Sequence, residues 1–442
     1  MKKRRVIICG AGGRDFFDFL VCFKDNPAYD VVCFTAAQIP GIEKRTFPKE
    51  LAGRLYKKNI PIYPEEQLQQ LIKKYDVDEV VLAYSDVSHL DVMRKASIIL
   101  AHGASFRLLG PKDTMLMSKK PVIAICAVRT GAGKSQTARR VADILKAQGL
   151  KVVTLRHPMP YGILMKQVVE RFTSYDDLKK YNTTIEEREE YEPWIQRSIP
   201  VYAGVDYAQI LKQAEKEADI IIWDAGNNDF SFVKPDLLIV VADPLRPGHE
   251  QLYYPGETNV RMADVIVINK VNSAQKQQVN TVIRNIKALN PRATMIKAAS
   301  QIIVDQPSLI THKRVLLVED GPTLTHGGMR FGAATVAAQR YHAKEIVSVK
   351  PYAVGSIKKT FEEYKHLKHE LPAMGYSKQQ IKDLQKTINR VPCDVVIDGS
   401  PVNLKKLMKV NKPIVNVTYE LEEIGRPTLE DILKKFIRKN AA

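Results

Sequence analysis

The stretch that decides the fold is residues 121–140, PVIAICAVRTGAGKSQTARR. Residues 122–128 form an apolar, β-branched run that is typical of a buried parallel strand. A glycine-rich turn with the sequence RTGAGKS follows at residues 129–135, and a helix is expected after it, with apolar positions at Ala138, Val141, Ala142 and Leu145. A strand, a glycine-rich turn, Lys-Ser and a helix in this order predict a phosphate-binding loop, because backbone N–H groups converge on an anion at a helix N-terminus.

The loop departs from the usual GxxxxGK[ST] pattern at one position, where Val128 replaces the first glycine. A short GAGKS segment also occurs in ordinary structural turns. The position between a buried strand and an amphipathic helix favours a nucleotide-phosphate site over a structural turn. In such a site Lys134 neutralises phosphate charge, and the hydroxyl of Ser135 is a ligand for Mg²⁺.

Composition and charge limit the class of protein. A chain of 442 residues suggests two or three domains. Its formal charge of +18 calls for a polyanionic partner. The basic residues are dispersed and no aromatic-rich binding pattern accompanies them, so a phosphorylated small molecule is favoured over nucleic acid.

Cysteine usage and hydropathy indicate the compartment. The five cysteines are scattered and mostly lie in apolar runs, which suggests buried thiols in a reducing cytoplasm. No apolar run approaches the roughly 20 residues of a membrane span. We therefore expect a cytoplasmic protein that has no membrane partner and forms a homodimer.

Alternating strands and helices predict an α/β protein with doubly wound parallel sheets. We expect an N-terminal Rossmann-like domain at 1–118, a central P-loop NTPase domain at 119–310 and a C-terminal α/β domain at 311–442. In the first domain, the turn at residues 10–14 (GAGGR) lacks the third glycine of GxGxxG. A phosphate cradle is favoured over a dinucleotide-binding turn, because the fingerprint is incomplete, and a tight turn is the remaining alternative.

A second segment that indicates a functional site is residues 219–229, DIIIWDAGNND, in which an apolar run ends in an aspartate. A phosphate-loop ATPase needs an aspartate at a strand end to hold the magnesium shell beside its serine. Asp224 stands in that position. Residues 269–272 (NKVN) resemble the guanine-reading NKxD motif with Asn272 in place of aspartate, which modestly favours adenine over guanine.

Two further segments are interpreted from their composition. The acidic run at residues 186–190 is predicted to be a solvated helix face without chemistry. Residues 321–332, GPTLTHGGMRFG, follow a strand and open a small-residue helix. Glycines, hydroxyls, a histidine and an arginine at a helix N-terminus predict a second anion site, with an elaborate turn as the alternative.

Together, CAVRTGAGKSQTARR, IIIWDAGNND and VEDGPTLTHGGMRFGAA resemble the archaeal cyclic 2,3-diphosphoglycerate synthetase family over essentially the full length. The resemblance implies an ATP- and Mg²⁺-dependent synthetase. Such an enzyme would close 2,3-bisphosphoglycerate, or a related phosphorylated acid, into an intramolecular phosphoanhydride, releasing ADP and phosphate. The charge chemistry agrees with this class, since two polyanions must be brought together and neutralised.

The expected roles follow from the motifs and the resemblance. The nucleotide is expected at Thr130, Gly131, Ala132, Gly133, Lys134, Ser135, Gln136, Asn269 and Lys270, with Mg²⁺ at Ser135 and Asp224. The substrate is expected at Arg156, His157, Asn227, Asn228, Thr325, His326, Gly327, Gly328 and Arg330. Catalysis is expected from Lys134, Asp224, His326 and Arg330. The rival class is a regulatory GTPase or metallochaperone-type switch that acts on a protein partner.

Overall fold

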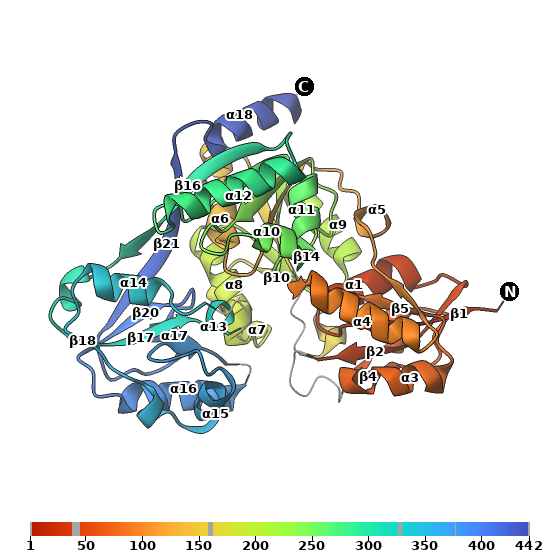
Figure 1. Ribbon diagram of the computed structural model, residues 1–442, viewed down its shortest axis with the longest axis horizontal. Helices are drawn as coiled ribbons and strands as arrows, with labels where there is room; N and C mark the ends of the chain where they lie inside the picture. The colour runs from red at the N-terminus through yellow and green to blue at the C-terminus, as the bar shows by residue number, and fades with distance from the viewer. Residues whose placement is uncertain (1, 38–44, 158–161, 326–328, 376, 441–442) are drawn as a thin grey trace.

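The computed structural model describes residues 2–37, 45–157, 162–325, 329–375 and 377–440, and leaves the side chains of Pro322 and Thr323 undescribed. Three regions follow one another in space as they do in sequence (Figure 1). The N-terminal region lies at one end, the C-terminal region at the other, and the central sheet lies between them. The predicted α/β fold is confirmed.

The N-terminal region is a largely parallel sheet in the order β3-β4-β2-β1-β5-β7, in which only β3 pairs antiparallel among the described strands. Apolar side chains fill both faces of this sheet. Its strands and helices are β1 (Arg4–Cys9), α1 (Arg14–Asp18), β2 (Tyr29–Ala36), β3 (Thr46–Phe47), α2 (Lys49–Ala52), β4 (Ile60–Pro64), α3 (Leu68–Tyr75), β5 (Glu79–Leu82), β6 (Val87–Ser88), α4 (His89–Ala101), β7 (Ser105–Arg107) and α5 (Pro111–Thr114).

The central region carries the strand and helix of the opening motif. Its first half contains β8 (Val122–Ala127), α6 (Lys134–Ala147), β9 (Val152–Arg156), β10 (Glu170–Phe172), α7 (Tyr175–Lys180), α8 (Ile185–Gln196), β11 (Val201–Ala203), α9 (Tyr207–Glu217) and β12 (Ile220–Asp224). Its second half contains β13 (Leu237–Ala242), α10 (His249–Leu252), β14 (Tyr253–Tyr254), α11 (Gly256–Met262), β15 (Val265–Ile268), α12 (Lys276–Leu289) and β16 (Thr294–Val304).

The C-terminal region continues the same sheet. It contains β17 (Arg314–Asp320), α13 (Gly321–Leu324), α14 (Ala333–Arg340), β18 (Glu345–Ile346), α15 (Gly355–Glu363), β19 (Leu371–Ala373), α16 (Lys378–Arg390), β20 (Val395–Gly399), α17 (Leu404–Leu407), β21 (Ile414–Ile424) and α18 (Leu429–Asn440). The two long strands β16 and β21 pair antiparallel from Lys297 with Ile424 to Val304 with Val417. This pairing joins the central and C-terminal strands into one sheet across the expected boundary at residue 310.

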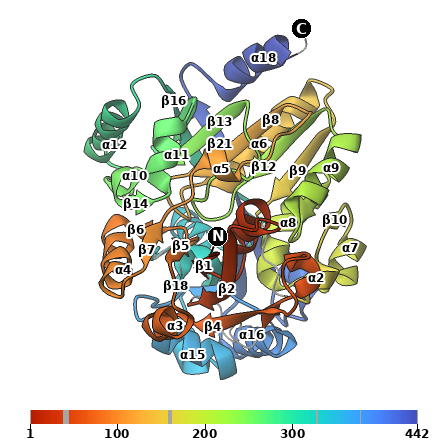
Figure 2. The ribbon, with the colours of Figure 1, turned by 90° about the vertical axis from the view of Figure 1, so that its right-hand side faces the viewer.

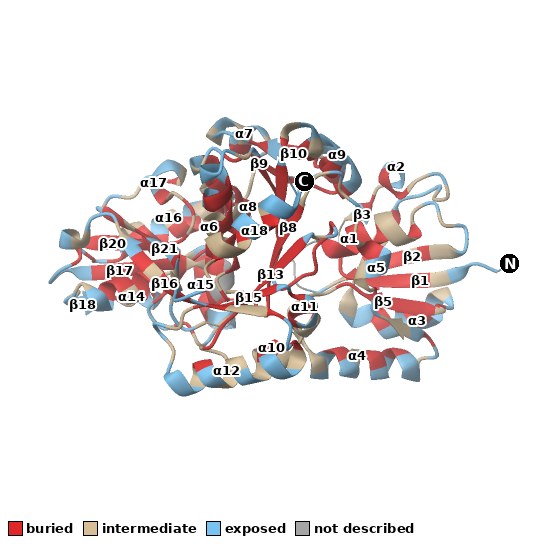
Figure 3. Ribbon diagram, turned by 90° about the horizontal axis from the view of Figure 1, so that it is seen from above, coloured by how far each residue is buried: buried red, intermediate tan, exposed pale blue. Residues whose placement is uncertain are grey.

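Helices cover both faces of the central sheet, and the strands between them are buried (Figure 3). One face packs on α6, α8 and α18, and the other on α9, α11 and α12. The four apolar positions expected on α6 are buried, as predicted. Helix α18 therefore returns from the C-terminal region to the core of the central one (Figures 1 and 2).

The N-terminal region docks on the central one through a small two-stranded sheet and an aromatic contact. β6 pairs antiparallel with β14, joining Ser88 to Tyr253 and Val87 to Tyr254. The rings of Phe17 and Phe232 stack with centroids 3.9 Å apart. No helix in the described ranges has both the length and the apolar character needed to cross a membrane.

Candidate functional site

The carboxyl ends of five parallel strands bring the expected motifs together. The strand order β9-β12-β8-β13-β15 places the phosphate loop between the end of β12 and the end of β13. Parallel strands end at the same edge, so segments distant in sequence meet there. Arg156 ends β9, Asp224 ends β12, Asp243 follows β13, and Asn269 with Lys270 follows β15.

The phosphate loop needs its glycines for both conformation and space. Gly131 and Gly133 have φ angles of +78° and +106°, which L side chains rarely adopt. A Cβ atom on Gly133 would lie 2.0 Å from Nδ2 of Asn269. Helix α6 begins at Lys134, so the loop leads into a helix N-terminus as an anion site requires.

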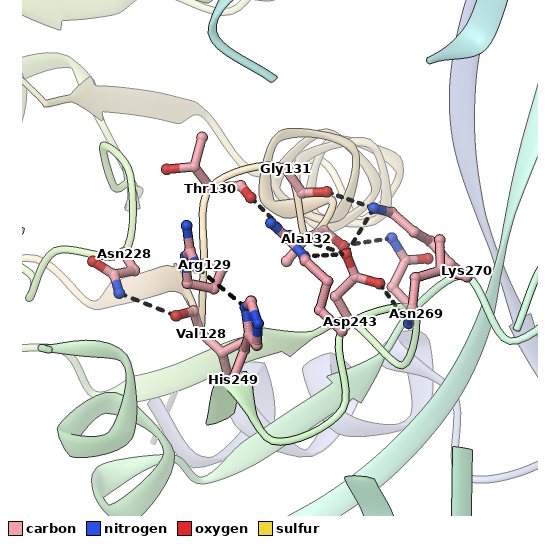
Figure 4. Close-up of polar contacts among 12 residues, drawn as sticks. Val128, Arg129, Thr130, Gly131, Ala132, Asn228, Asp243, His249, Asn269 and Lys270 are labelled. Carbon is pink, nitrogen blue, oxygen red and sulfur yellow. Dashed lines mark hydrogen bonds and ion pairs between the residues drawn. The ribbon is translucent and has the colours of Figure 1, made fainter. Parts of the chain in front are cut away.

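The NKxD-like segment braces the second half of this loop (Figure 4). Nδ2 of Asn269 donates to the Ala132 carbonyl at 3.0 Å. Nζ of Lys270 donates to the Gly131 carbonyl at 2.5 Å and pairs with Asp243 at 3.0 Å. Asn269 and Lys270 thus act on the loop backbone, and Lys270 also lines the cavity beside it.

A buried charge cluster lies under the loop. Oδ1 of Asp224 is 3.3 Å from Nζ of Lys134 and 3.1 Å from Nη1 of Arg156. Burial by itself would raise the pKa of Asp224, but Arg156 and Lys134 hold it below its ordinary value. Burial and the neighbouring Arg156 lower the pKa of Lys134. The cluster places an ionised carboxylate between two cations.

The residues present fit a divalent cation bound with a nucleotide. Oδ2 of Asp224 is buried and has no hydrogen-bond partner among the described residues, and Ser135 follows Lys134 in the first turn of α6. The described residues hold no cluster of three or more His, Cys, Asp or Glu side chains placed for a metal. Mg²⁺ is usually held by one or two protein oxygens together with phosphate oxygens, so this sparse donor set suits it.

One cavity of about 330 Å³ extends from the phosphate loop to the C-terminal region. On the loop side it is lined by a basic wall that includes Lys134, Arg156 and Lys270. Four carboxylates also line it and are called here the acidic wall: Glu189 and Glu190 from α8, with Glu319 and Asp320 from β17. The two walls meet where Glu190 pairs with Arg156. The central and C-terminal regions therefore share one site.

Two carboxylates of the acidic wall, Glu189 and Glu319, are deeply buried. Glu189 is 5% exposed, and its Oε1 atom is buried without a hydrogen-bond partner in the described structure. Burial raises the pKa of Glu189 well above its ordinary value, and the nearby Asp320 adds to the shift. Burial likewise raises the pKa of Glu319 to about 7 and that of Asp398, just behind the wall, to about 7.

The expected second anion site is occupied in part by Glu319. Its carboxylate accepts the backbone N–H groups of Gly332, Ala334 and Thr335 at 2.8–3.1 Å, at the N-terminus of α14. These N–H groups are therefore engaged by a carboxylate of the chain itself, and a ligand phosphate would have to displace it. His326, Gly327 and Gly328 lie outside the described residues.

The N-terminal glycine turn behaves in the same way. The Asp15 carboxylate accepts the N–H groups of Gly12 and Gly13 at 3.1 and 3.2 Å. Arg14 is buried and pairs with Asp18 at 3.5 Å. The turn is thus built around its own carboxylate, which favours the tight-turn alternative over a phosphate cradle.

Most of the residues predicted for the nucleotide lie together. Of these residues, the cavity is lined by Thr130, Gly131, Gly133, Lys134, Ser135, Gln136 and Lys270. Ala132 and Asn269 lie in and against the loop, and Asp224 lies behind Lys134. Asn272 bonds both backbone groups of Ser300, at 3.1 and 3.3 Å, so its amide is already engaged.

Several residues predicted for the substrate lie elsewhere. Nε2 of His157 is 2.7 Å from Asp229, and Asn228 is buried. Neither His157 nor Asn228 is among the described residues that line the cavity. The Thr325 hydroxyl donates to the Gly321 carbonyl at 2.8 Å. Arg330 is exposed, while its neighbours Met329 and Phe331 line the cavity. Of the predicted substrate residues that the structure describes, Arg156 and Asn227 line the cavity, and Asn228 contacts the start of the loop at Val128.

The prediction of a solvated acidic run at 186–190 is wrong. Glu186, Glu187 and Glu189 are buried, and Glu189 and Glu190 line the cavity. A signal was present in the sequence: Tyr191, Trp194 and Ile195 follow within a few residues at helical spacing and anchor α8 in the core. The prediction considered only the high charge of the run and not these apolar neighbours.

The fold and the cavity define a phosphate-loop α/β protein whose site lies at the carboxyl edge of a parallel sheet. The chain is 60% identical over 437 residues to arginine synthetase ArcE of Thermococcus kodakarensis, a match that covers 99% of this chain and 98% of that protein. The chain therefore belongs to the family of this arginine synthetase. No model of a protein family matches it.

Similarity to solved structures is weak. The ATP complex of LpxK from Aquifex aeolicus is 13% identical with a TM-score of 0.46, and the match covers 84% of this chain and 99% of that one. A UDP-N-acetylmuramate:L-alanyl-gamma-D-glutamyl-meso-diaminopimelate ligase from Neisseria meningitides is 13% identical with a TM-score of 0.28, covering 68% and 81% of the two chains.

Proposed function

We propose that this chain is an ATP-dependent synthetase that forms the guanidinium group of arginine. Membership in the arginine synthetase family supports the product, and the phosphate loop supports the use of a nucleoside triphosphate. The observation that carries the proposal is the composition of the cavity. A phosphate loop faces buried carboxylates within one space of about 330 Å³.

The acidic wall suits a planar cation. A guanidinium group is recognised by carboxylates that accept its N–H groups in pairs. Glu189 offers a buried oxygen without a partner in the described structure, and Asp320 lines the same side. A site built only for polyanions would have cations in these positions.

The reaction that would use both walls can be worked out from the proposed product, arginine. The ureido counterpart of arginine is citrulline, which differs by one oxygen in place of one nitrogen. A ureido oxygen is a poor leaving group, so it must be activated, and transfer of the γ-phosphoryl group of ATP converts it into a phosphate ester. Ammonia then attacks the ureido carbon, the C–O bond breaks, and phosphate leaves. The overall products are arginine, ADP and phosphate.

The chain's own residues have defined tasks in this scheme. The loop N–H groups and Lys134 hold the nucleotide phosphates and neutralise the charge that develops during transfer. Arg156 keeps Asp224 ionised. Ser135 and Asp224 would hold Mg²⁺, which would supply further positive charge at the phosphates. The acidic wall would orient the nitrogen-rich end of the substrate toward the loop.

An isotope experiment tests the proposal. The protein is incubated with ATP, citrulline and ¹⁵N-ammonium, and arginine is measured by mass spectrometry together with ADP. We expect ADP and ¹⁵N-labelled arginine in equal amounts, each dependent on all three substrates. ADP formation that does not depend on citrulline, with no labelled arginine, would overturn the proposal.

Formation of a cyclic phosphoanhydride from 2,3-bisphosphoglycerate, a polyanionic substrate, is the second candidate. The formal charge of +18 and the basic wall favour it. In a parallel reaction, phosphorus NMR would detect a new anhydride signal. The GTPase-type switch is weaker, because the Asn272 amide is bonded to Ser300. The homodimer and the cytoplasmic location stay predictions.

A further inference from the structure

The phosphate loop is held from two sides, and one side belongs to the N-terminal region. Asn269 and Lys270 brace residues 131–132 from within the central region. The first part of the loop, residues 128–130, contains no glycine and includes the valine that departs from the usual pattern. This part is held by Asp86, which lies between β5 and β6.

Asp86 contacts two consecutive loop residues. Its Oδ1 atom is 2.5 Å from Nε of Arg129. Its Oδ2 atom accepts the backbone N–H of Thr130 at 3.3 Å. The Asp86 side chain is 8% exposed, so water screens this ion pair only weakly. Both Arg129 and Thr130 line the cavity.

Asp86 is itself fixed in place. Its backbone has a φ angle of +59°, and its N–H donates to Oδ1 of Asn228 at 2.7 Å. Nδ2 of Asn228 donates to the Val128 carbonyl at 3.0 Å (Figure 4). A single amide side chain therefore links the N-terminal region, the segment after β12 and the start of the phosphate loop.

Arg129 also contacts two residues of the central region, Tyr253 and His249. Its guanidinium carbon lies 3.7 Å from the centroid of the Tyr253 ring. Its Nη1 atom donates to Nδ1 of His249 at 3.1 Å (Figure 4). Tyr253 is on β14, which pairs with β6 immediately after Asp86. The contacts that dock the N-terminal region on the central one are therefore the same contacts that hold the start of the phosphate loop.

We propose that Asp86 is a positioning residue that holds the phosphate loop in its nucleotide-binding conformation, so that the N-terminal region completes the nucleotide site. The physical reason is preorganisation. The Thr130 N–H is engaged by Asp86, so the groups offered to phosphate are those that follow it in the loop. They bind phosphate well only if they are already oriented, and Asp86 fixes the backbone that leads to them through Arg129 and Thr130. The inference rests on the nucleotide binding in the proposed function.

Two substitutions of Asp86 separate its contact with Arg129 from its contact with Thr130. Asp86→Ala removes both contacts, whereas Asp86→Asn keeps an oxygen for the Thr130 N–H and removes the charge that faces Arg129. Asp91→Asn is the matched control, because Asp91 lies on α4 in the same region and contacts only neighbouring residues of that helix start in the described structure. ATP and ADP binding are measured by calorimetry, KM values by steady-state kinetics, and folding by thermal melting.

For Asp86→Ala we expect the Kd of ATP to rise about tenfold or more, as the loss of one charge-assisted hydrogen bond predicts, with the KM of citrulline changed less than about twofold. Asp86→Asn should show a smaller rise, and Asp91→Asn none. An unchanged nucleotide Kd in both Asp86 variants, with or without a lower Tm, would overturn the inference. Absence of ATP binding by the unaltered protein would instead overturn the proposed function.

Discussion

The two walls of the cavity contain ionisable groups of opposite type, and these groups are satisfied in different ways. On the basic wall, cations and carboxylates pair directly, as Lys134 and Arg156 do with Asp224. On the acidic wall, Glu319 is satisfied by backbone N–H groups and Glu189 retains a buried oxygen without a described partner. The pKa of Asp224 is accordingly lowered, whereas the pKa values of Glu189 and Glu319 are raised by burial. The paired cations of the basic wall suit the binding of phosphate. A carboxylate without a partner, such as Glu189, suits a ligand that carries a cationic group.

The largest effect is expected on the basic wall. Lys134→Ala removes the cation that neutralises phosphate, and turnover should fall about 10²- to 10³-fold or more, as for other groups that stabilise transition-state charge. The protein should stay folded. Turnover is measured as ADP release, with a thermal melt as the check on folding.

The exposed Lys216→Ala on α9 is the control for loss of a lysine. Unchanged ATP hydrolysis and synthesis in Lys134→Ala would show that the basic wall does not hold the reacting phosphate.

A smaller effect is expected on the acidic wall. Glu189→Gln keeps the shape of the side chain and removes its ability to ionise when a cation binds beside it. Arginine affinity should fall about 10- to 100-fold, since a charge-assisted hydrogen bond contributes about 1.5–3 kcal/mol, while ATP affinity should stay the same. Calorimetric titration with arginine and, separately, with ATP measures the difference.

Glu430→Gln, at an exposed carboxylate of α18, controls for the loss of one negative charge. If Glu189→Gln weakened ATP and left arginine binding intact, the acidic wall would belong to the nucleotide and the contrast between the walls would fail.

The smallest effect is on stability, and it tests the raised pKa values directly. Burial raises the pKa of Asp398 from 3.8 to about 7, so the folded protein binds a proton there more tightly than the unfolded chain. The stability contributed by the protonated group is fully present below pH 3.8 and is lost as the pH rises through about 7. Asp398→Asn removes this loss.

Urea unfolding at pH 5 and pH 8 measures the effect. We expect the unfolding free energy of the unaltered protein to fall more steeply between these pH values than that of Asp398→Asn, by about 1 kcal/mol or more. Parallel pH profiles for the two proteins would mean that Asp398 is ionised throughout this range.

Elements with strong local patterns were predicted well. β8, α6, β12 and β15 lie close to their expected positions, because apolar runs bounded by glycine or charged residues constrain strands and helices locally. Thr130 to Ser135 and Lys270 were expected at the nucleotide site, and the structure brings them together around one cavity. Their positions follow from strand ends that meet at one edge of a parallel sheet.

Other parts were decided by contacts that no local pattern reveals. The acidic run on α8 was interpreted from its charge, whereas its burial depends on the packing of α8 in the central core and, through Ile185, in the C-terminal core. No prediction linked Asp86 to the loop, and its contact with Arg129 is made where β6 pairs with β14. The pairing of β16 with β21 places strands of two expected domains in one sheet.

By itself, the sequence determined the phosphate loop, its strand and helix, and the aspartate at the end of β12, since these depend on backbone conformation and hydrophobic periodicity over short distances. The tertiary structure alone decided what faces the loop. Carboxylates from α8 and β17 meet there, and Asp86 arrives from the N-terminal region. The physical reason is that charge acts through space, so the partner of a buried group depends on how the chain folds and not on its neighbours in sequence.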